Sequence, residues 1–462
     1  MFESKVYRRR REALKKQLGS GLALFWGNKE APMNYPANTY HFRQDSSFLY
    51  FFGIDSPDLV GLIDCDEDRE ILFGQELTLE DIIWMGHQPK LTEKARQAGI
   101  REVLPLKEIE PHIEKALAAG RRVHYLPPYR SDTVIDLAQL LKKSPEEIKT
   151  GASEDLIKAT VALRAVKDEL EVKEVEAALS LTREMYLAAM KMARPGRLEW
   201  ELVAAMEAVG LSQGCHQAFP IILTINGQIL HNHEHGHRLE RGKLLVMDAG
   251  VESKEHYASD ITRTLPVGWK FTLKQRDIYE IVLQAQETAI AAIKPGVPFK
   301  DVHLQACRVI ASGLKDAGLM KGEVEEAIAA GAHALFFPHG LGHMLGLDVH
   351  DMEGLGEKYV GYDESFQRSE QFGLAYLRLA RKLEPGFVVT VEPGIYFIPA
   401  LMAKWKKEKK HTAFINYEKV MDYVNFGGVR IEDDVLVTPQ GHRVLGQRIP
   451  KSIEEIESFR SL

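Results

Sequence analysis

The sequence predicts a protein of two regions, an α/β domain in the first third of the chain and a larger α+β domain after it. Short apolar runs alternate with helical patterns in the first third, as is typical of α/β domains. From roughly residue 144 the chain becomes polar and rich in turn residues, and long helical patterns interleaved with strand-like runs then follow. We therefore expect a boundary near residue 155, with domains over residues 1–155 and 156–462.

The first domain is predicted from its apolar runs, which are GLALFWG, SSFLYFFGI, LVGLIDCD, REILFG and RRVHYLP. Helical patterns such as EIEPHIEKALAAG and TVIDLAQLLKKS occur among them. The opening MFESKVYRRRREALKKQLG has the pattern of an amphipathic helix and is not followed by the apolar core of a signal peptide. We expect these elements to form a domain that folds independently.

The second domain begins with a long helical pattern over residues 163–193, and three more follow at about 198–209, 273–293 and 299–316. The strand-like runs are KLLVMDAG, YASDITRTLPV, FVVTVEPGIYF and GGVRIEDDVLVT. Each carries an acidic residue at or near its apolar centre, which is unusual for strands that only build a core. The lysine-rich run KWKKEKK at 404–410 is typical of a solvated insertion.

The composition excludes several classes of partner. The 462 residues are 45% hydrophobic, which suffices for substantial cores, and their formal net charge is -7. No global positive field exists to hold nucleic acid or an anionic membrane surface. No apolar run reaches the roughly 18 residues that a membrane span needs. The widely spaced cysteines Cys65, Cys215 and Cys307 are typical of buried thiols in a reducing compartment, so we expect a cytoplasmic protein.

Carboxylates lie in the apolar strands of the second domain, where an unpartnered carboxylate is costly to bury. Asp248 follows the apolar stretch of KLLVMDAG, and Asp260 sits on a run that the segment VESKEHY would return antiparallel to the first. Glu392 ends the β-branched run of VVTVEPG, just before a Pro-Gly turn. We expect the first two side chains to face each other.

A fourth carboxylate belongs to VRIEDDVLV, where the period of two places Arg430, Glu432 and Asp434 on one face of the strand. Converging anions repel one another by several kcal/mol at short range unless cations lie between them. The pattern therefore favours a metal site, with a pair of divalent ions as its natural occupant.

Histidine completes the ligand set in FFPHGLGHMLGLDVHD, a glycine-rich apolar segment that contains His339, His343 and His350. Glycine permits close approach of the backbone. One imidazole with four carboxylates is an oxygen-rich set, which suits Mn, Co or Fe, tolerates Zn, and differs from a thiolate site. Two metals about 3.5 to 4 Å apart are typical of hydrolytic centres of this kind.

These segments resemble a known family. In this order, MDAG, SDITRT, HGLGHMLGLDVHD, VEPGIYF and VRIEDD resemble the metallopeptidases of the creatinase and methionine aminopeptidase fold, also called pita-bread, over residues 160–462. NYPANTYHFRQDSSFLYFFGID and IIWMG resemble the creatinase-type amino-terminal domain of its proline-specific branch, which holds aminopeptidase P and prolidase. The resemblance implies a pita-bread catalytic domain behind that α/β domain. It also implies hydrolysis of the bond before proline in di- or oligopeptides.

The resemblance also implies a metal-binding role for each matching residue. Two divalent metals, usually manganese in this branch, would be bound by Asp248, Asp260, His343, Glu392 and Glu432. Among these, Asp260 and Glu432 would bridge the two ions. Glu392 would also accept the proton of the attacking water.

Further residues that match the family would act on the substrate. His231, His339 and His350 would surround the scissile peptide, and one or more would stabilise the oxyanion or pass a proton to the proline nitrogen. Arg430 and Tyr396 would orient the carboxylates and the intermediate. The alternative is structural: Arg430 would then only pair with a neighbouring acid, and Tyr396 would only pack in a strand.

Recognition of the substrate carboxylate separates the two activities of the branch. A dipeptidase needs a cation for the free carboxylate of the terminal proline, whereas an aminopeptidase needs an open channel there. YLRLARKLEPGFVVTVEPGIYF resembles prolidase of the eukaryotic type, which implies that Arg378 binds that carboxylate in a bidentate manner. The long insertion before VRIEDD also resembles prolidase. An Xaa-Pro dipeptidase is therefore favoured, with an Xaa-Pro aminopeptidase as the alternative and a helix-surface position as the simpler interpretation of Arg378.

The loop before His231 departs from the family pattern. It reads AFPIILTINGQILHN, which is shorter than usual, with Phe219 where prolidase has a tyrosine and Asn232 after the histidine. This loop lines the amino-terminal side of the substrate, so the preference for the residue before proline stays open. Three histidines without a family counterpart suit a solvated loop: His233, His235 and His237.

Two further expectations concern partners and activity. The family usually forms dimers in which the amino-terminal domain of one chain closes the partner's active site, and Trp84 in IIWMGH is a candidate for such a contact. Some proteins of this fold have lost their metals and act as binding modules. This is the remote alternative, because all five ligand positions are filled here.

Overall fold

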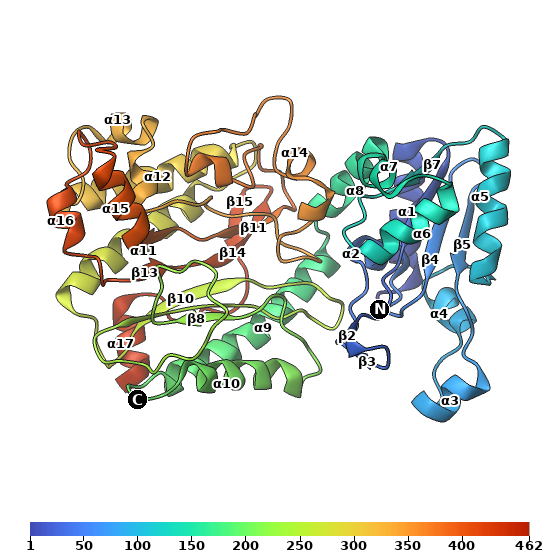
Figure 1. The fold of residues 1–462 in the computed structure, drawn as a ribbon, viewed down its shortest axis with the longest axis horizontal. Coiled ribbons are helices and arrows are strands. Elements are labelled where there is room, and N and C mark those ends of the chain that lie inside the picture. Colours follow the sequence, from blue (N-terminus) through green and yellow to red (C-terminus); the bar gives the residue numbers. More distant parts are fainter. Residues whose placement is uncertain (462) are drawn as a thin grey trace. The chain divides into compact units, whose positions relative to one another are not determined.

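The computed structural model describes residues 1–461, which form two compact units. The first unit contains Met1–Arg164 and Met352–Tyr359, and the second contains Ala165–Asp351 and the chain from Val360 onward (Figure 1). The predicted boundary near residue 155 lies at the start of helix α8 (Glu154–Ala165), whereas the units divide at the end of this helix. The polar segment after residue 144, which led to the predicted boundary, forms helix α7 (Pro145–Thr150), whose Ile148 is buried.

A five-stranded sheet forms the centre of the first unit. In spatial order its strands are β6 (Glu102–Leu104), β5 (Arg69–Phe73), β4 (Val60–Asp64), β1 (Leu22–Trp26) and β7 (Val123–Tyr125). The three central strands are antiparallel, and each edge strand is parallel to its neighbour. The helices are α1 (Ser4–Leu18), α2 (Ser46–Phe52), α3 (Leu79–Met85), α4 (Leu91–Gln97), α5 (Ile109–Ala118), α6 (Ser131–Leu141), α7 (Pro145–Thr150) and α8 (Glu154–Ala165).

Helices cover both faces of this sheet, as the α/β prediction requires. Side chains alternate between faces along β1. Leu22 and Leu24 pack in a buried cluster with Ile113 of α5. Phe25 points to the opposite face, where its ring centroid lies 4.7 Å from that of Phe51 in α2. This unit also contains a short hairpin of β2 (Pro32–Tyr35) and β3 (Asn38–Thr39) and the 3-10 helix η1 (Leu106–Glu108). The chain later returns to it with η3 (Glu353–Leu355) and most of α14 (Glu357–Val360).

One apolar run of the first domain is a helix rather than a strand. Residues 46–52 form α2, which is buried along its whole length. Asp45 caps the helix, because its side chain accepts a hydrogen bond from the backbone N–H of Phe48 at 2.8 Å. Gly53 ends the helix in the left-handed conformation. A short apolar run does not by itself distinguish a buried strand from a buried helix. In this segment the capping residue Asp45 is the feature that indicates a helix.

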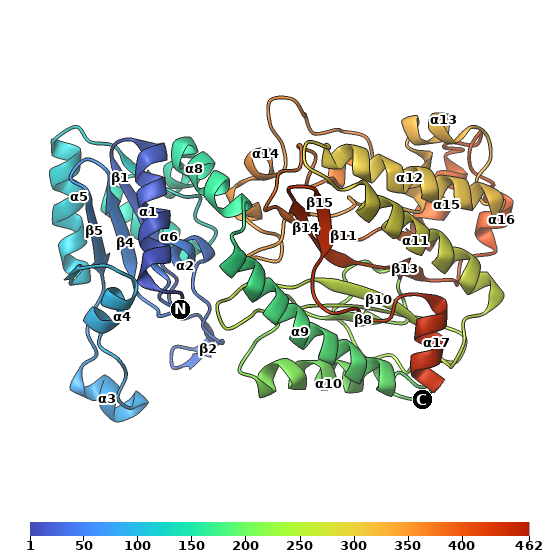
Figure 2. The same ribbon diagram turned by 180° about the vertical axis from the view of Figure 1, so that it is seen from behind.

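The second unit combines several small sheets with long helices. β8 (Ile222–Thr224), β9 (Leu244–Ala249) and β10 (Ile261–Pro266) form one sheet, and β11 (Val388–Val391), β14 (Asp433–Thr438) and β15 (Gly441–Val444) form another. β12 (Gly394–Tyr396) pairs with β13 (Gly428–Arg430). The long helices α10 (Glu199–Ser212), α11 (Leu273–Ala292) and α12 (Phe299–Asp316) confirm three predicted helical patterns. The first pattern, over residues 163–193, is divided between the end of α8 and the long helix α9 (Glu169–Met192). Figure 2 shows α11 and α12 in front of the strands of this unit, and α9 and α10 beside and below β8 and β10, so the long helices lie on the outside of the sheets.

Shorter helices follow the long ones. They are α13 (Val324–Ala329), η2 (Ala332–Leu335), η4 (Leu374–Tyr376), α15 (Pro399–Lys407), α16 (Tyr417–Met421) and α17 (Ile453–Ser461). The prediction of a solvated insertion at 404–410 is wrong for one face of α15. Met402 and Trp405, three residues apart and therefore on one side of the helix, are buried. The lysines occupy the exposed side, so the insertion is a packed part of this unit.

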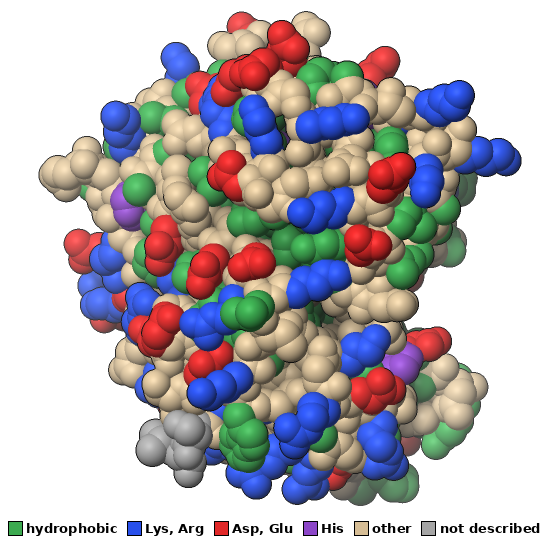
Figure 3. Space-filling view, turned by 90° about the vertical axis from the view of Figure 1, so that its left-hand side faces the viewer, with side chains coloured by type: hydrophobic (Ala, Val, Ile, Leu, Met, Phe, Trp, Pro, Cys, Tyr) green, Lys and Arg blue, Asp and Glu red, His purple; other side chains and the backbone are tan. Residues whose placement is uncertain are grey.

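The described residues also show the state of the cysteines, the hydropathy of the helices and the charges on one face. All three cysteines are free thiols, with Cys215 and Cys307 buried and Cys65 half-buried. Within residues 1–461, no helix is both long and apolar enough to cross a membrane. Figure 3 shows a face of the molecule on which Lys and Arg side chains lie among Asp and Glu side chains. Charges of both signs therefore mix on this face.

Candidate metal centre and substrate cavity

The predicted carboxylates meet where several strands begin or end. β9 and β10 are antiparallel with Thr262 opposite Asp248, and Asp260 immediately precedes β10. An isolated β-bridge between Thr262 and Glu432 connects this hairpin to the segment between β13 and β14. Glu392 directly follows β11, which pairs with β14. The backbone therefore brings all four carboxylates to one place, as the strand patterns predicted.

His343 lies among these carboxylates. Its Nε2 atom is 3.4 Å from Oδ2 of Asp260 and 3.8 Å from Oε1 of Glu392. One potential ligand atom each from Asp260, His343 and Glu432 lie within 4.8 Å of one another. Nδ1 of His343 is 3.0 Å from the carbonyl oxygen of Met344, so Nδ1 carries the proton. The lone pair of Nε2 is thereby free and directed at the carboxylates, as in a metal ligand.

Buried oxygen atoms without partners show that these residues fit divalent metal ions. Oδ1 of Asp248, Oδ1 of Asp260 and Oε1 of Glu432 have no hydrogen-bond partner among the described residues. The exposed fractions of these residues are only 7%, 5% and 1%. Leaving a buried charged acceptor unsatisfied costs more than a typical hydrogen bond contributes. A hard or borderline cation would satisfy all three atoms at once.

Burial and mutual repulsion raise the pKa values of this centre when no cation is present. Burial raises the pKa of Asp260 well above its usual range, and the carboxyl groups of Glu432 and Asp248 raise it further. Burial also raises the pKa of Glu432, next to Glu392. It raises the pKa of Glu392 to about 8, although Arg430 opposes this. Folding thus brings together acidic groups whose charges the chain does not neutralise by itself.

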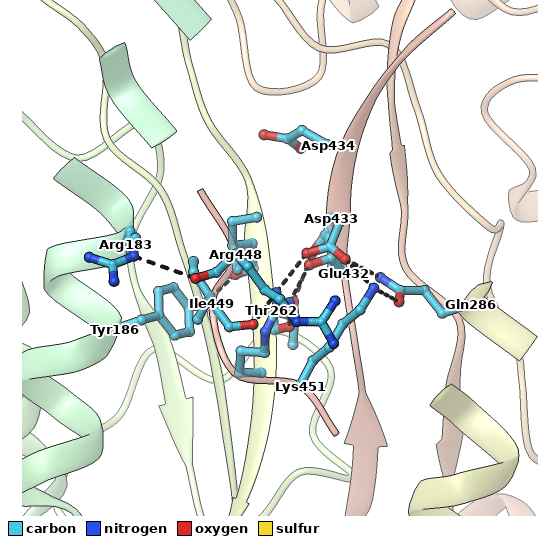
Figure 4. A network of polar contacts seen from close by, with 12 residues as sticks. Arg183, Tyr186, Thr262, Gln286, Glu432, Asp433, Asp434, Arg448, Ile449 and Lys451 are labelled. Carbon is cyan, nitrogen blue, oxygen red and sulfur yellow. Dashed lines mark hydrogen bonds and ion pairs between the residues drawn. The ribbon is translucent and has the colours of Figure 1, made fainter. Parts of the chain in front are cut away.

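The next residue along the strand points the other way and is fully paired. Asp433 accepts hydrogen bonds from Nη2 of Arg263 at 2.7 Å, from Nζ of Lys451 at 2.7 Å and from Nε2 of Gln286 at 3.0 Å (Figure 4). Burial would raise the pKa of Asp433, but the two cations lower it to about 2. Asp434 returns to the side of the metal centre, where its Oδ2 accepts the backbone N–H of Asp260 at 3.0 Å. The predicted alternation along VRIEDD is therefore correct.

A chain of hydrogen bonds connects the metal centre to a second histidine. Arg430 donates to Oδ2 of Asp248 at 2.5 Å and to Oη of Tyr396 at 2.9 Å. Nδ1 of His339 donates to the carbonyl oxygen of Gly340 at 2.8 Å, so its Nε2 accepts from the hydroxyl of Tyr396 at 2.9 Å. Burial lowers the pKa of His339 to about 3, so the ring is neutral. Arg430 and Tyr396, the two residues predicted to orient the site, therefore both form hydrogen bonds within it.

A cavity of about 680 Å³ opens onto this centre. The predicted site residues that line it are His231, Asp248, Asp260, His339, His343, His350, Arg378, Glu392, Arg430 and Glu432. Tyr396 is fully buried and reaches the cavity through His339. The rings of His343 and His350 lie 4.2 Å apart. Arg378 follows η4 and faces the cavity rather than lying on a helix surface.

Sequence reasoning missed several residues of this site. Thr262 donates from Oγ1 to Oε2 of Glu432 at 2.7 Å and accepts from Nε of Arg430 at 3.2 Å. A signal was available, because Thr262 lies two residues after Asp260 on an extended segment and therefore shares its face. Four apolar or aromatic wall residues were also missed: Phe372, Tyr376, Ile398 and Leu401. Only the tertiary structure brings them to the cavity.

The histidine-rich loop is less uniform than predicted. His235 is buried, with its ring perpendicular to that of Trp200 at 5.0 Å, so its assignment to a solvated loop is wrong. His233 and His237 are exposed, as expected, and His233 also lines the cavity. The buried Asn232 donates from Nδ2 to Oγ1 of Thr224 at 2.9 Å. The unusual residue after His231 therefore fixes this loop to β8.

These features define a class of protein: a metal-dependent hydrolase whose carboxylate and histidine ligands converge in a peptide-sized cavity. Residues 173–439 match the family described as Metallopeptidase family M24, and residues 7–125 match the Aminopeptidase P, N-terminal domain. The chain belongs to metallopeptidase family M24. The predicted pita-bread catalytic domain, with its creatinase-type amino-terminal domain, is thereby confirmed.

Relatives with both activities of the proline-specific branch resemble the chain. It is 33% identical to a Probable Xaa-Pro aminopeptidase pepP of Aspergillus fumigatus, covering 90% of this chain and 87% of that protein. It is also 33% identical to the Xaa-Pro dipeptidase of Homo sapiens, covering 90% and 84%. Among solved structures, a zinc-substituted aminopeptidase P of E. coli in complex with product has a TM-score of 0.82 at 30% identity, covering 100% and 99%.

Proposed function

We propose that the chain hydrolyses the peptide bond before proline and acts as an Xaa-Pro dipeptidase. The observation that carries the dipeptidase assignment is the position of Arg378 in the wall of the cavity that contains the carboxylate cluster. A guanidinium there suits the free carboxylate of a carboxyl-terminal proline, since it forms two parallel hydrogen bonds with such a group. The human relative named Xaa-Pro dipeptidase supports this choice.

An Xaa-Pro aminopeptidase that acts on longer peptides is the second candidate. The fungal relative and the E. coli structure carry aminopeptidase names. The cavity of about 680 Å³ also has room for more than a dipeptide. The two candidates share their metal chemistry and differ only in what lies beyond the proline.

Five residues are proposed to hold two divalent ions, with Mn²⁺ as the first choice and Co²⁺, Fe²⁺ or Zn²⁺ as alternatives. They are Asp248, Asp260, His343, Glu392 and Glu432. When bound, such ions polarise a carbonyl oxygen and lower the pKa of water. The unpartnered buried oxygens of this cluster support the assignment. Metal analysis of protein prepared without chelator tests it, and a content well below one ion per chain would contradict it.

The remaining roles belong to protein side chains. Glu392 is the proposed general base, since it lies in the cavity with a carboxyl oxygen 3.8 Å from Nε2 of His343. His231, His339 and His350 would surround the scissile peptide, where one or more of them would stabilise the oxyanion or pass a proton to the leaving nitrogen. Arg430 would hold Asp248 in place through their 2.5 Å contact.

A comparison of Ala-Pro with Ala-Pro-Ala tests the choice between dipeptidase and aminopeptidase. We expect the Mn-loaded protein to cleave Ala-Pro, and Arg378→Ala to lower kcat/KM for this substrate roughly 10- to 100-fold, which is the worth of a hydrogen bond to a charged group. Arg378→Lys keeps the charge but loses the paired geometry, so it should recover only part of this loss. Rapid cleavage of Ala-Pro-Ala that leaves Ala-Pro intact would contradict the dipeptidase proposal.

We also propose that the protein is a cytoplasmic homodimer. Helix α3 supports an interface, because its apolar side chains are exposed: Leu79 74%, Ile83 70%, Trp84 80% and Met85 57%. Exposed apolar patches of this kind commonly mark contacts between proteins. Light scattering coupled to gel filtration measures the mass in solution, and a monomeric mass at micromolar concentration would contradict the dimer.

A further inference from the structure

A second group of potential metal ligands lies outside the cavity, between α12 and η2. His303 and Cys307 are four residues apart on α12 and therefore share one face of the helix. His333 belongs to η2. One potential ligand atom from each of these residues lies within 4.8 Å of the other two, and Sγ of Cys307 is 3.4 Å from Nε2 of His303.

The polar atoms of this group are buried without adequate partners. The exposed fractions are 1% for His303, 0% for Cys307 and 1% for His333. Nδ1 of His303 and both ring nitrogens of His333 have no hydrogen-bond partner among residues 1–461. Burying a polar group in this state costs about 1–3 kcal/mol. A metal ion bound between these residues would satisfy one of the two unpartnered ring nitrogens of His333.

The group is separate from the catalytic centre. The ring of Phe337 lies 5.4 Å from that of His303 on one side and 4.9 Å from that of His339 on the other. The two sites also differ in chemistry. The catalytic centre consists of carboxylates with one imidazole, whereas this group offers one thiol and two imidazoles. Hard divalent ions prefer the former, and soft thiolate-binding ions prefer the latter.

Charge decides which soft or borderline ion fits best. Zn²⁺ bound to one thiolate and two neutral imidazoles would leave a net positive charge in a fully buried place. A buried uncompensated charge is strongly unfavourable. A monovalent ion with a single thiolate forms a neutral unit instead. Burial lowers the pKa values of His303 and His333, which favours neutral rings, and raises the pKa of the Cys307 thiol, so this thiol would lose its proton only as the ion binds.

We propose that His303, Cys307 and His333 form a second metal site, which binds one Cu(I) ion in three-coordinate geometry. Binding replaces the S–H bond of Cys307 by a bond between sulfur and copper, and the proton passes to the buffer without any change of oxidation state. Metal bonds of about 2.0 to 2.3 Å place three planar ligand atoms roughly 3.5 to 3.8 Å apart. The three ligand atoms all lie within 4.8 Å of one another, and small side-chain rotations would bring them to this geometry.

Titration of the Mn-loaded full-length protein with Cu(I) tests this site. The ion is kept reduced with ascorbate under anaerobic conditions, and a chromogenic chelator such as bicinchoninate competes for it. Because the site is buried, loading is carried out both by prolonged incubation and by refolding in the presence of Cu(I). We expect one Cu(I) retained per chain, a rise in melting temperature, and an X-ray absorption spectrum with one sulfur and two nitrogen neighbours.

Matched variants separate this site from other thiols. Cys307→Ala and His333→Asn should fold, retain peptidase activity with Mn²⁺, and lose the retained Cu(I), whereas Cys215→Ala should retain it. Cys215 is likewise a buried free thiol but belongs to no predicted ligand group among the described residues. The proposal is overturned if folded wild-type protein retains no Cu(I) after either loading procedure. It is also overturned if Cys307→Ala retains as much as the wild type. The peptidase assay reports on the proposed function separately, so failure of one proposal does not affect the other.

Discussion

A cluster of buried carboxylates and a single ion-paired carboxylate lie on opposite sides of the chain at residues 432–434. On one side, Glu432 joins Asp260 and His343, and its Oε1 has no hydrogen-bond partner among the described residues. On the other side, Asp433 is bound by Arg263, Lys451 and Gln286 (Figure 4). Burial raises the pKa of Glu432, whereas the cations around Asp433 lower its pKa to about 2.

The difference shows how a structural carboxylate is distinguished from a functional one. Both residues are almost fully buried, at 1% and 5% exposure, so burial does not separate them. What separates them is whether the chain supplies the opposite charge. Asp433 has two cationic partners inside the protein and needs no ligand. The cluster around Glu432 has more acidic groups than cationic partners, so either protons or an added cation must neutralise the excess.

The largest expected effect follows from removing the proposed general base. Glu392→Gln should lower kcat about 10²- to 10⁴-fold, because the amide does not accept the proton of the attacking water. The metal-free variant should be at least as stable as the metal-free wild type, since one member of a repelling group becomes neutral. Steady-state kinetics and thermal unfolding measure the two effects. Glu384→Gln, an exposed carboxylate beside Arg381, is the control, and a near-normal kcat for Glu392→Gln would refute the assignment.

On the structural side, Asp433→Asn should reduce stability with little direct effect on chemistry. The substitution leaves Arg263 and Lys451 buried without their shared anion, which typically costs about 3 to 5 kcal/mol. The midpoint of urea unfolding measures this loss. Asp434→Asn is the matched control: burial raises the pKa of this carboxyl group and so disfavours its charged form, and the cost of removing the charge should be much smaller. Equal losses in both variants would show that the ion pairs are unimportant.

The pH dependence of stability should have opposite sign in the two groups. The folded-state pKa of Glu392 is raised from 4.5 to about 8, so the folded state binds the proton more tightly. Metal-free protein should therefore lose stability as the pH rises from about 4.5 to 8, by up to 1.4 kcal/mol per pKa unit of difference. The folded-state pKa of Asp433 is lowered from 3.8 to about 2, so its contribution is lost as the pH falls through that range.

Metal addition provides the control for this pH prediction. Melting temperatures should be recorded across the pH range with chelator and with Mn²⁺. We expect Mn²⁺ to abolish the decline toward pH 8, because the carboxylates then have a cation, and to leave the acid decline in place. A decline toward pH 8 that persists with saturating Mn²⁺ would show that it does not originate in this centre.

Much of the metal centre could be predicted from the sequence because its signals are local. Asp248, Asp260, Glu392 and Glu432 each lie in or beside an apolar strand pattern, and a short turn returns the second of these strands antiparallel to the first. The alternation along VRIEDD is likewise a property of any extended chain. Helix α2 shows the limit of such reasoning, since a short apolar run is compatible with either kind of element until the cap at Asp45 is considered.

The other parts of the site depend on contacts between distant segments, which no local pattern encodes. The walls at Phe372 and Leu401 belong to different segments that meet only in the folded chain. His235 looks solvated in a polar, histidine-rich stretch, but it packs against Trp200 of α10. The partners of Asp433 are equally distant, because Arg263 lies 170 residues away in sequence. Ion pairs between distant residues determine which carboxylates are structural, and the sequence alone does not reveal these pairs.

The smallest expected effect concerns the hydroxyl of Tyr396, which links the metal centre to His339. Tyr396→Phe removes the hydrogen bonds with Arg430 and His339, and it should lower kcat roughly 10-fold and stability by about 1 kcal/mol. Tyr279→Phe is the matched control, since this buried hydroxyl donates to the carbonyl oxygen of Lys451 at 2.7 Å, next to the Asp433 group. It should lose similar stability and keep its kcat. If both variants kept normal kcat, the Tyr396 hydroxyl would have only a structural role. The functional residues on this side of the strand would then be the metal ligands alone.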